Sequence, residues 1–150
     1  MWRNRSACPF TFALKASESS GSGITSTALG AQTTTERTAL INWLRGLDNK
    51  GDERKDTTGN PLTSTTAMRP SVHGDVVHSR PVAINYGSDD LANAQVVVFY
   101  GANDGVLRAV NGNQATSIGS AAPGSELWSF VPPEFYGSIK RLYDNTTRIN

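Results

Sequence analysis

The chain has 150 residues, of which 37% are hydrophobic and 18% charged, with 14 glycines, 7 prolines and one cysteine. This length suits one ordinary domain or part of a larger one, and the low apolar share favours short strands and loops over a helical bundle. Fourteen Lys and Arg against thirteen Asp and Glu give a net charge of +1, so no field of one sign recruits nucleic acid or an anionic membrane. No stretch approaches the ~18 apolar residues that span a bilayer, and we expect no membrane span.

Residues 1–32 are interpreted as a disordered segment or linker. Within and just beyond it, residues 17–35 are almost all small and polar, a composition that buries too little apolar surface to offset its ordering entropy. Cys8 is the single cysteine, which excludes an internal disulfide and a cysteine-based zinc cluster in this chain.

The extreme N-terminus has some features of a secretory signal peptide. Arg3 and Arg5 precede an apolar run over residues 7–14, and small residues follow it as they do at a cleavage site. The run is short and contains Pro9, which weakens the match. The sequence therefore leaves open whether residues 1–16 are a signal peptide.

Residues 33–69 are expected to form a capped helix and a polar loop. Thr33 is placed as the N-cap and Glu36 follows three residues later, which is the spacing of a capping box. The apolar stripe at three- and four-residue steps consists of Ala39, Leu40, Trp43, Leu44 and Leu47. Gly46 can end the helix in the left-handed conformation, and residues 48–66 continue as a charged loop rich in turn residues.

Residues 70–150 have the character of short β-strands. Apolar runs with β-branched and aromatic residues alternate here with glycine and asparagine turns. The predicted strands are 76–79, 82–86, 95–100, 106–110 and 126–131. Asp104-Gly105 supplies the positive-φ positions of a tight hairpin between the third and fourth of these strands.

The last predicted element is a short helix after the final strand. Pro133 can occupy its first turn. Phe135, Ile139 and Leu142 recur at helical spacing and share one face.

Residues 98–130 have the order of a propeller blade repeat. The residues that fit such a repeat are Gly101, Gly105, Ala109, Gly124 and Trp128. In radial β-architectures a glycine leaves space for the flat ring of a tryptophan to dock between neighbouring blades. This single repeat resembles the blades of quinoprotein-type propellers.

A longer match extends over roughly residues 36–144. Its four blocks, in chain order, are residues 41–46, 69–82, 100–109 and 126–132. They resemble the start of the C-terminal β-propeller of the PilC/PilY family, whose members are type IV pilus biogenesis proteins and tip-associated adhesins. Four blocks in the right order are far more specific than one motif.

The resemblance implies a mainly β chain: a partial β-propeller of about two blades, preceded by one amphipathic helix and a flexible N-terminal segment. A propeller needs at least ~4 blades of ~40–50 residues, so we expect a fragment of a larger protein. The resemblance further implies a secreted protein of the periplasm, outer membrane or pilus tip. Its implied partners are minor pilins and host or abiotic surfaces.

Calcium is implied for the full-length protein but not for this chain, because the family's calcium loop lies further along the propeller. The nearest local candidate is residues 48–52, where Lys50 occupies a position that would have to supply an oxygen ligand. A solvated turn is the favoured interpretation. Residues 45–48 also depart from the integrin-type Arg-Gly-Asp tripeptide of some relatives, because Leu47 is inserted.

No catalytic, cofactor-binding or metal-ligating residue is assigned, and we expect no enzyme activity. On a strand, His73 and Asp75 would share a face while His78 points to the other, so a structural hydrogen-bonding role is favoured. Ser71 and Ser79 lack the glycine-flanked turn of a hydrolase nucleophile.

Two alternatives remain beside the pilus interpretation. The first is a fragment of a quinoprotein dehydrogenase, an enzyme that would need more blades and a calcium-ligating acidic cluster to hold pyrroloquinoline quinone. The second is a truncated product without activity of its own. Trp43 and Trp128 are interpreted as core or blade-docking aromatics rather than ligand platforms.

Overall fold

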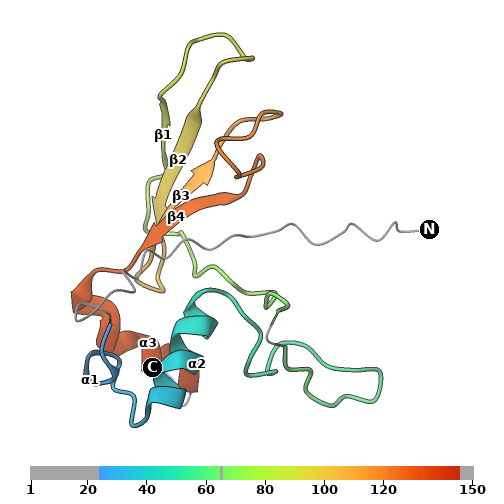
Figure 1. Cartoon of the computed structure of the whole chain (residues 1–150), viewed down its shortest axis with the longest axis vertical. Coiled ribbons are helices and arrows are strands. Elements are labelled where there is room, and N and C mark those ends of the chain that lie inside the picture. The colour runs from blue at the N-terminus through green and yellow to red at the C-terminus, as the bar shows by residue number, and fades with distance from the viewer. Residues whose placement is uncertain (1–23, 65, 146–150) are drawn as a thin grey trace. The chain divides into compact units, whose positions relative to one another are not determined.

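A computed structural model describes residues 24–64 and 66–145 (Figure 1). The signal-peptide question, Cys8 and the first part of the predicted linker lie outside the described residues. The elements in chain order are α1 (Ser26–Leu29), α2 (Thr34–Leu44), β1 (Val82–Asn85), β2 (Val96–Gly101), β3 (Leu107–Asn111), β4 (Glu126–Phe130), the 3₁₀ turn η1 (Pro133–Phe135) and α3 (Tyr136–Asp144).

The described residues divide into two compact units. The sheet unit contains residues 79–101 and 107–130 and carries all four strands. The helical unit contains residues 24–78, 102–106 and 131–145, with position 65 left out, and carries the helices. Each unit is described below by itself.

The sheet unit is one antiparallel meander in the order β1-β2-β3-β4 (Figure 1). This architecture confirms the prediction of a mainly β chain, and four of the five predicted strands form close to their expected positions. The described residues hold this single four-stranded sheet, whereas strands for about two blades were expected. Each strand pairs antiparallel with the next one in the sequence, so all four join one sheet instead of two.

The predicted strand at 76–79 is wrong. The carbonyl of Asp75 accepts a hydrogen bond from the backbone N–H of Asn103 at 2.9 Å, so this backbone is bound to a turn. Val77 lies in an exposed turn with 78% of its surface accessible. Two adjacent valines favour a strand locally, but without a neighbouring strand to pair with they form none.

The predicted hairpin between β2 and β3 is confirmed, with a different turn. The N–H of Ala102 donates to the carbonyl of Val106 at 3.2 Å, and the N–H of Gly105 donates to the carbonyl of Ala102 at 3.0 Å. Gly105 has a φ of +78°, and Asp104 does not share a positive φ with it. A Cβ at Gly105 would also lie 3.0 Å from the ring of Phe135, so glycine is required here by backbone angle and by space.

One face of the sheet is entirely uncharged. The strand register places on this face Val82, Ile84, Val97, Phe99, Gly101, Leu107, Ala109, Asn111, Trp128 and Phe130, and we call it the apolar face. Trp128 lies 5.8 Å from Phe99 between ring centroids and is 39% exposed, so it is not a core residue of the described chain. Val82 and Phe130 are about half exposed.

The opposite face of the sheet buries a charge pair. Nε of Arg108 lies 3.7 Å from a carboxylate oxygen of Glu126, and each side chain is only 1% exposed. A β-bulge between β3 and β4 shifts the register at Ala109 and Val110, which brings Glu126 opposite Val110 and diagonal to Arg108. Both faces of the sheet therefore contain buried side chains, since Val97 and Ala109 are buried on the apolar face.

In the helical unit, α2 begins as predicted. The hydroxyl of Thr33 accepts the N–H of Glu36 at 3.1 Å, and the carboxylate of Glu36 accepts the N–H of Gln32 at 2.6 Å. The second bond is thus made one residue earlier than a capping box prescribes. After the helix, Gly46 has a φ of +92°, which confirms its predicted role in ending the helix.

Helix α1 is a correction to the predicted linker. The hydroxyl of Thr25 caps it by accepting the N–H of Ala28 at 3.1 Å, and Gly30 ends it with a φ of +67°. Leu29 is 1% exposed. The polar composition gave no sign of this capped turn. A helix this short is stabilised by tertiary packing, here of its single buried leucine.

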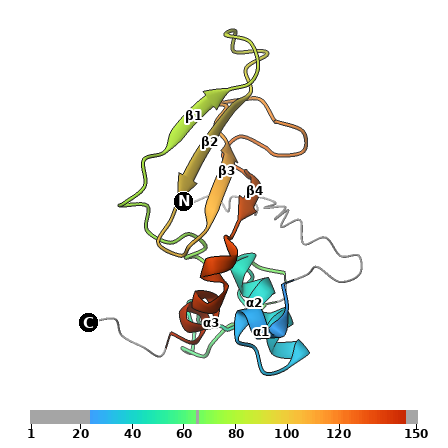
Figure 2. The ribbon, with the colours of Figure 1, turned by 90° about the vertical axis from the view of Figure 1, so that its left-hand side faces the viewer.

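The three helices contact one another (Figure 2), and most of the buried apolar side chains belong to the helical unit. The buried apolar side chains of this unit are Leu29, Ala31, Leu40, Leu44, Val106, Val131 and Ile139. Helix α3 follows η1 at the predicted position, and of its predicted stripe Ile139 is buried while Phe135 and Leu142 are partly exposed. Lys140 on α3 binds Glu36 on α2.

Candidate functional site

The helical unit contains a cleft of about 400 Å³. Trp43 from α2 and Leu142 from α3 contribute apolar walls, while Glu53, Arg69 and Asp104 come from loops. The cleft therefore combines aromatic, acidic and basic groups at a place where three parts of the helical unit meet. We refer to it as the Trp43 cleft.

Arg69 and Trp43 form the centre of the cleft. The guanidinium carbon of Arg69 lies 4.0 Å from the ring centroid of Trp43, a cation–π contact. Tyr143 packs its ring edge-on against Trp43 with centroids 5.7 Å apart. Trp43 is thus contacted by a cation and by a second aromatic ring.

The guanidinium of Arg69 is held by acceptors. Its Nη1 lies 3.3 Å from Oε1 of Glu53 and donates to the carbonyl of Ser71. The other oxygen of Glu53 accepts the N–H of Ser71 at 2.7 Å. Burial lowers the pKa of Arg69 from its usual value, and the carboxylate of Glu53 opposes that shift.

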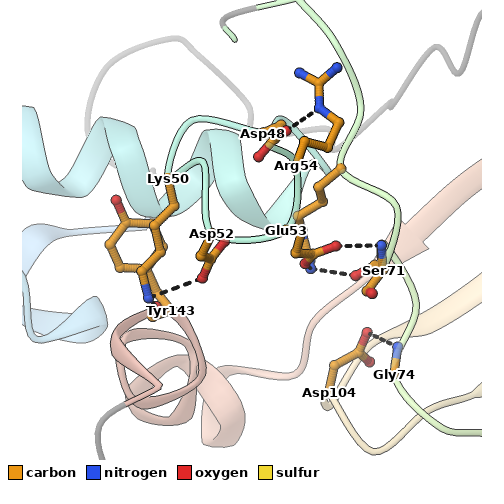
Figure 3. Close-up of polar contacts among 10 residues, drawn as sticks. Asp48, Lys50, Asp52, Glu53, Arg54, Ser71, Gly74, Asp104 and Tyr143 are labelled. Atoms are coloured by element: carbon orange, nitrogen blue, oxygen red, sulfur yellow. Dashed lines mark hydrogen bonds and ion pairs between the residues drawn. The ribbon is translucent and has the colours of Figure 1, made fainter. Parts of the chain in front are cut away.

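Asp104 fixes two backbone segments. Its Oδ2 accepts the N–H of Gly74 at 3.0 Å, and its Oδ1 accepts the N–H of Val106 at 3.0 Å. A Cβ at Gly74 would lie 2.7 Å from the backbone nitrogen of Asp104, which is closer than side-chain carbons approach. The hairpin turn and the loop that carries Gly74 are therefore matched in shape as well as in hydrogen bonding (Figure 3).

The two serines weighed in the sequence have structural contacts. Ser71 bonds Glu53 through its backbone N–H, as described above. In the sheet unit, Oγ of Ser79 accepts the N–H of Gly101 at 3.1 Å, where β2 ends. Each serine thus serves the framework of its own unit.

The histidine and aspartate cluster does not lie on a strand, so the expected sharing of a face by His73 and Asp75 is wrong. His73, Asp75 and His78 occupy an exposed loop. Across residues 24–64 and 66–145, no three His, Cys, Asp or Glu side chains are grouped to hold a metal ion.

The predicted solvated turn at residues 48–52 is wrong at its first position. Asp48 is 1% exposed and its carboxylate forms an ion pair with Nε of Arg54 (Figure 3). Lys50 lies 3.4 Å from Asp52 and donates to the carbonyl of Tyr143. Two charge pairs therefore join residues within the loop, and the hydrogen bond from Lys50 to the carbonyl of Tyr143 ties it to α3.

A further carboxylate lies in the same long loop. Oδ1 of Asp56 accepts the hydroxyl of Thr58 at 2.7 Å and the N–H of Asn60 at 2.9 Å. These hydrogen bonds, that of the Thr58 hydroxyl most strongly, lower the pKa of Asp56 to about 2. Acceptors that bind several donors prefer the ionised form.

We expect this turn to keep its structure well below the usual pKa of an aspartate. The contribution is fully present above the unfolded value of about 3.9 and is lost as the pH falls through about 2. A ¹³C NMR titration of the Asp56 carboxyl should give a midpoint near 2, and Thr58→Val should raise it. A wild-type midpoint near 4 would contradict the assignment.

The polar groups of the Trp43 cleft chiefly bind one another, so the arrangement is suited to holding a shape and presenting a surface. No family model, curated protein or solved structure matches the chain. Within the described part of the chain, no helix is long and apolar enough to cross a membrane.

Proposed function

We propose that this chain is part of a type IV pilus assembly and tip adhesion protein of the PilC/PilY kind, and that it acts there as a binding module without catalysis. In this proposal the sheet is one blade of a β-propeller that the longer protein completes. The partners are minor pilins at the pilus tip and the surfaces to which the pilus attaches, and the location is outside the cytoplasm.

The observation that carries the proposal is that the sequence blocks behind the resemblance touch one another. Trp43 of the first block stacks with Arg69 of the second. Gly74 of the second block binds Asp104 of the third. The first three blocks, which lie far apart in the chain, therefore contact one another inside the helical unit. Such contacts are expected if the resemblance to the family reflects a shared architecture.

The sheet unit adds a second line of support. Its third and fourth blocks pair directly, since Ala109 on β3 lies opposite Trp128 on β4. The apolar face leaves Trp128 and Phe130 substantially exposed. Exposed apolar surface of this kind marks sites that pack against other protein, which supports binding and assembly as the role of the module.

Gene deletion tests the proposal. In a piliated bacterium that encodes this chain in a single gene, we expect deletion to abolish surface pili and twitching motility, and the wild-type gene to restore them. Gly74→Ala should restore them poorly because its Cβ meets the backbone of Asp104. Gly137→Ala is the matched control, because its added Cβ meets nothing within 4 Å. Normal piliation in the deletion strain would refute the proposal.

A further inference from the structure

Strand β1 has a free edge among the described residues. It pairs with β2 on one side only, and residues 80–93, which include it, are all exposed. The N–H of Tyr86 donates to the carbonyl of Gln95 at 3.0 Å. Since alternate residues of an antiparallel strand direct their backbone groups to opposite sides, the even-numbered residues bond β2, and Ala83 and Asn85 direct their N–H and carbonyl groups outward.

This edge lacks most of the usual protection against pairing. Residues 82–87 contain no charged side chain, and the register of β1 with β2 is regular. Val82, Ile84 and Tyr86 lie on one side of the chain and are 52%, 41% and 61% exposed. Natural sheets guard such edges with charges, prolines, bulges or a covering segment, so the edge is suited to accept one more strand.

The edge is complementary to itself in the antiparallel direction. If Ile84 lies opposite Ile84 of a second copy, Ala83 lies opposite Asn85 of that copy. These two residues direct their backbone groups outward, so they can exchange both of their hydrogen bonds. On the apolar face, Val82 then lies opposite Tyr86 of the second copy, and the exposed apolar side chains of each edge cover those of the other.

The ends of the strand fit the same register. Pro81, which has no N–H, falls opposite Gly87 of the second copy, and the N–H of Gly87 already donates to Oδ1 of Asn85 in its own chain at 3.0 Å. Neither residue therefore leaves a donor without an acceptor. A register with Ala83 opposite itself would instead place Pro81 opposite Asn85, whose carbonyl would then lack a donor.

The charges that flank the strand are complementary in this arrangement. Arg80 precedes the strand, whereas Asp89 and Asp90 follow it in the loop that leads to β2. Hydrogen bonds, that from Ser88 first, lower the pKa of Asp90. Because the two copies run antiparallel, Arg80 of each copy falls opposite Ser88 and beside the two aspartates of the other. An in-register parallel pairing would set like charges side by side, which is unfavourable.

We propose that the edge of β1 pairs antiparallel with β1 of a second copy of this chain, so that two sheets join into one across a two-fold axis between the Ile84 residues. Each copy offers the other the same surface, as in other two-fold dimers. The contact is one short strand on each side, so the dimer is a reversible one of small interface. The inference does not rest on the proposed pilus function.

Sedimentation equilibrium of the full chain tests the pairing, and we expect a dimer fraction that rises with protein concentration. Ala83→Pro removes an outward N–H and leaves the hydrogen bonds to β2 in place. It should raise the dissociation constant of the dimer at least about tenfold, because each copy loses one hydrogen bond. Ala83→Val keeps the N–H and is the matched control. A wild-type chain that stays monomeric up to about 1 mM, or an Ala83→Pro variant that dimerises like the wild type, would overturn the inference.

Disulfide trapping tests the register in a Cys8→Ser background, which removes the single native cysteine. Ile84→Cys places two thiols at a non-hydrogen-bonded pair on the axis, where Cα atoms are about 4.5 Å apart and a disulfide can form. Val82→Cys is the matched control, because residue 82 is also exposed but lies about 13 Å along the strands from its own copy. We expect Ile84→Cys alone to form a covalent dimer on mild oxidation. Equal cross-linking by both variants, or polymers larger than a dimer, would overturn the inference.

Discussion

Replacing Arg108 by methionine is expected to lower the free energy of unfolding by about 3–5 kcal/mol, the usual range for removing one partner of a buried ion pair. The side chains of Arg108 and Glu126 are both 1% exposed. In the variant, the Glu126 carboxylate would therefore stay buried without its charged partner. Urea denaturation of the wild-type and variant chains, with the slope checked for equality, measures the difference.

The double variant separates the ion pair from the packing of the sheet. Arg108→Met combined with Glu126→Leu removes both charges, and we expect its stability to lie within about 1 kcal/mol of the wild type, since apolar replacement of a whole pair is often neutral. If the double variant is as unstable as Arg108→Met alone, the charge pair is not the cause of the loss.

Replacing Arg69 by methionine should cost about 2–3 kcal/mol, in keeping with the loss of hydrogen bonds to a charged group. Arg69 is 8% exposed, stacks on Trp43 and binds both Glu53 and Ser71. Glu53 is 23% exposed, so water partly compensates its carboxylate and the expected loss stays below that for the Arg108 pair.

Two further substitutions serve as controls for Arg69→Met. Arg80 is an exposed arginine, and Arg80→Met should change the stability by no more than about 0.5 kcal/mol. Arg69→Lys should recover less than half of the loss, because an ammonium lacks the planar fork that stacks on the ring and binds two acceptors. Full recovery by lysine would show that charge alone is required at this position.

Local signals predicted the elements that are fixed by local contacts. Thr33 and Gly46 mark the two ends of α2 through hydrogen bonds and a positive φ that involve only nearby residues. The Asp104-Gly105 hairpin was equally readable, although only Gly105 takes the left-handed conformation. Such features depend on residue type and spacing, which a sequence displays directly.

Features that depend on distant partners were missed. The valines at 76–79 have strand propensity, yet the neighbouring backbone binds Asn103 from the hairpin turn. The polar composition of residues 17–35 predicted a linker, whereas packing against other helices buries Leu29. The sequence indicated a packing role for Trp43, but its contacts with Arg69 and Tyr143 join residues far apart in the chain and could not be read from local spacing.

The interleaving of the two units limits how the chain can be cut. The helical unit takes residues 102–106 from between β2 and β3, and residues 131–145 from beyond β4. No single cleavage point therefore yields either unit intact, because the sheet unit lies between residues 24–78 and 131–145 of the helical unit. A piece that retains the sheet unit alone would have to begin at Ser79, end after Phe130 and carry a foreign turn in place of residues 102–106.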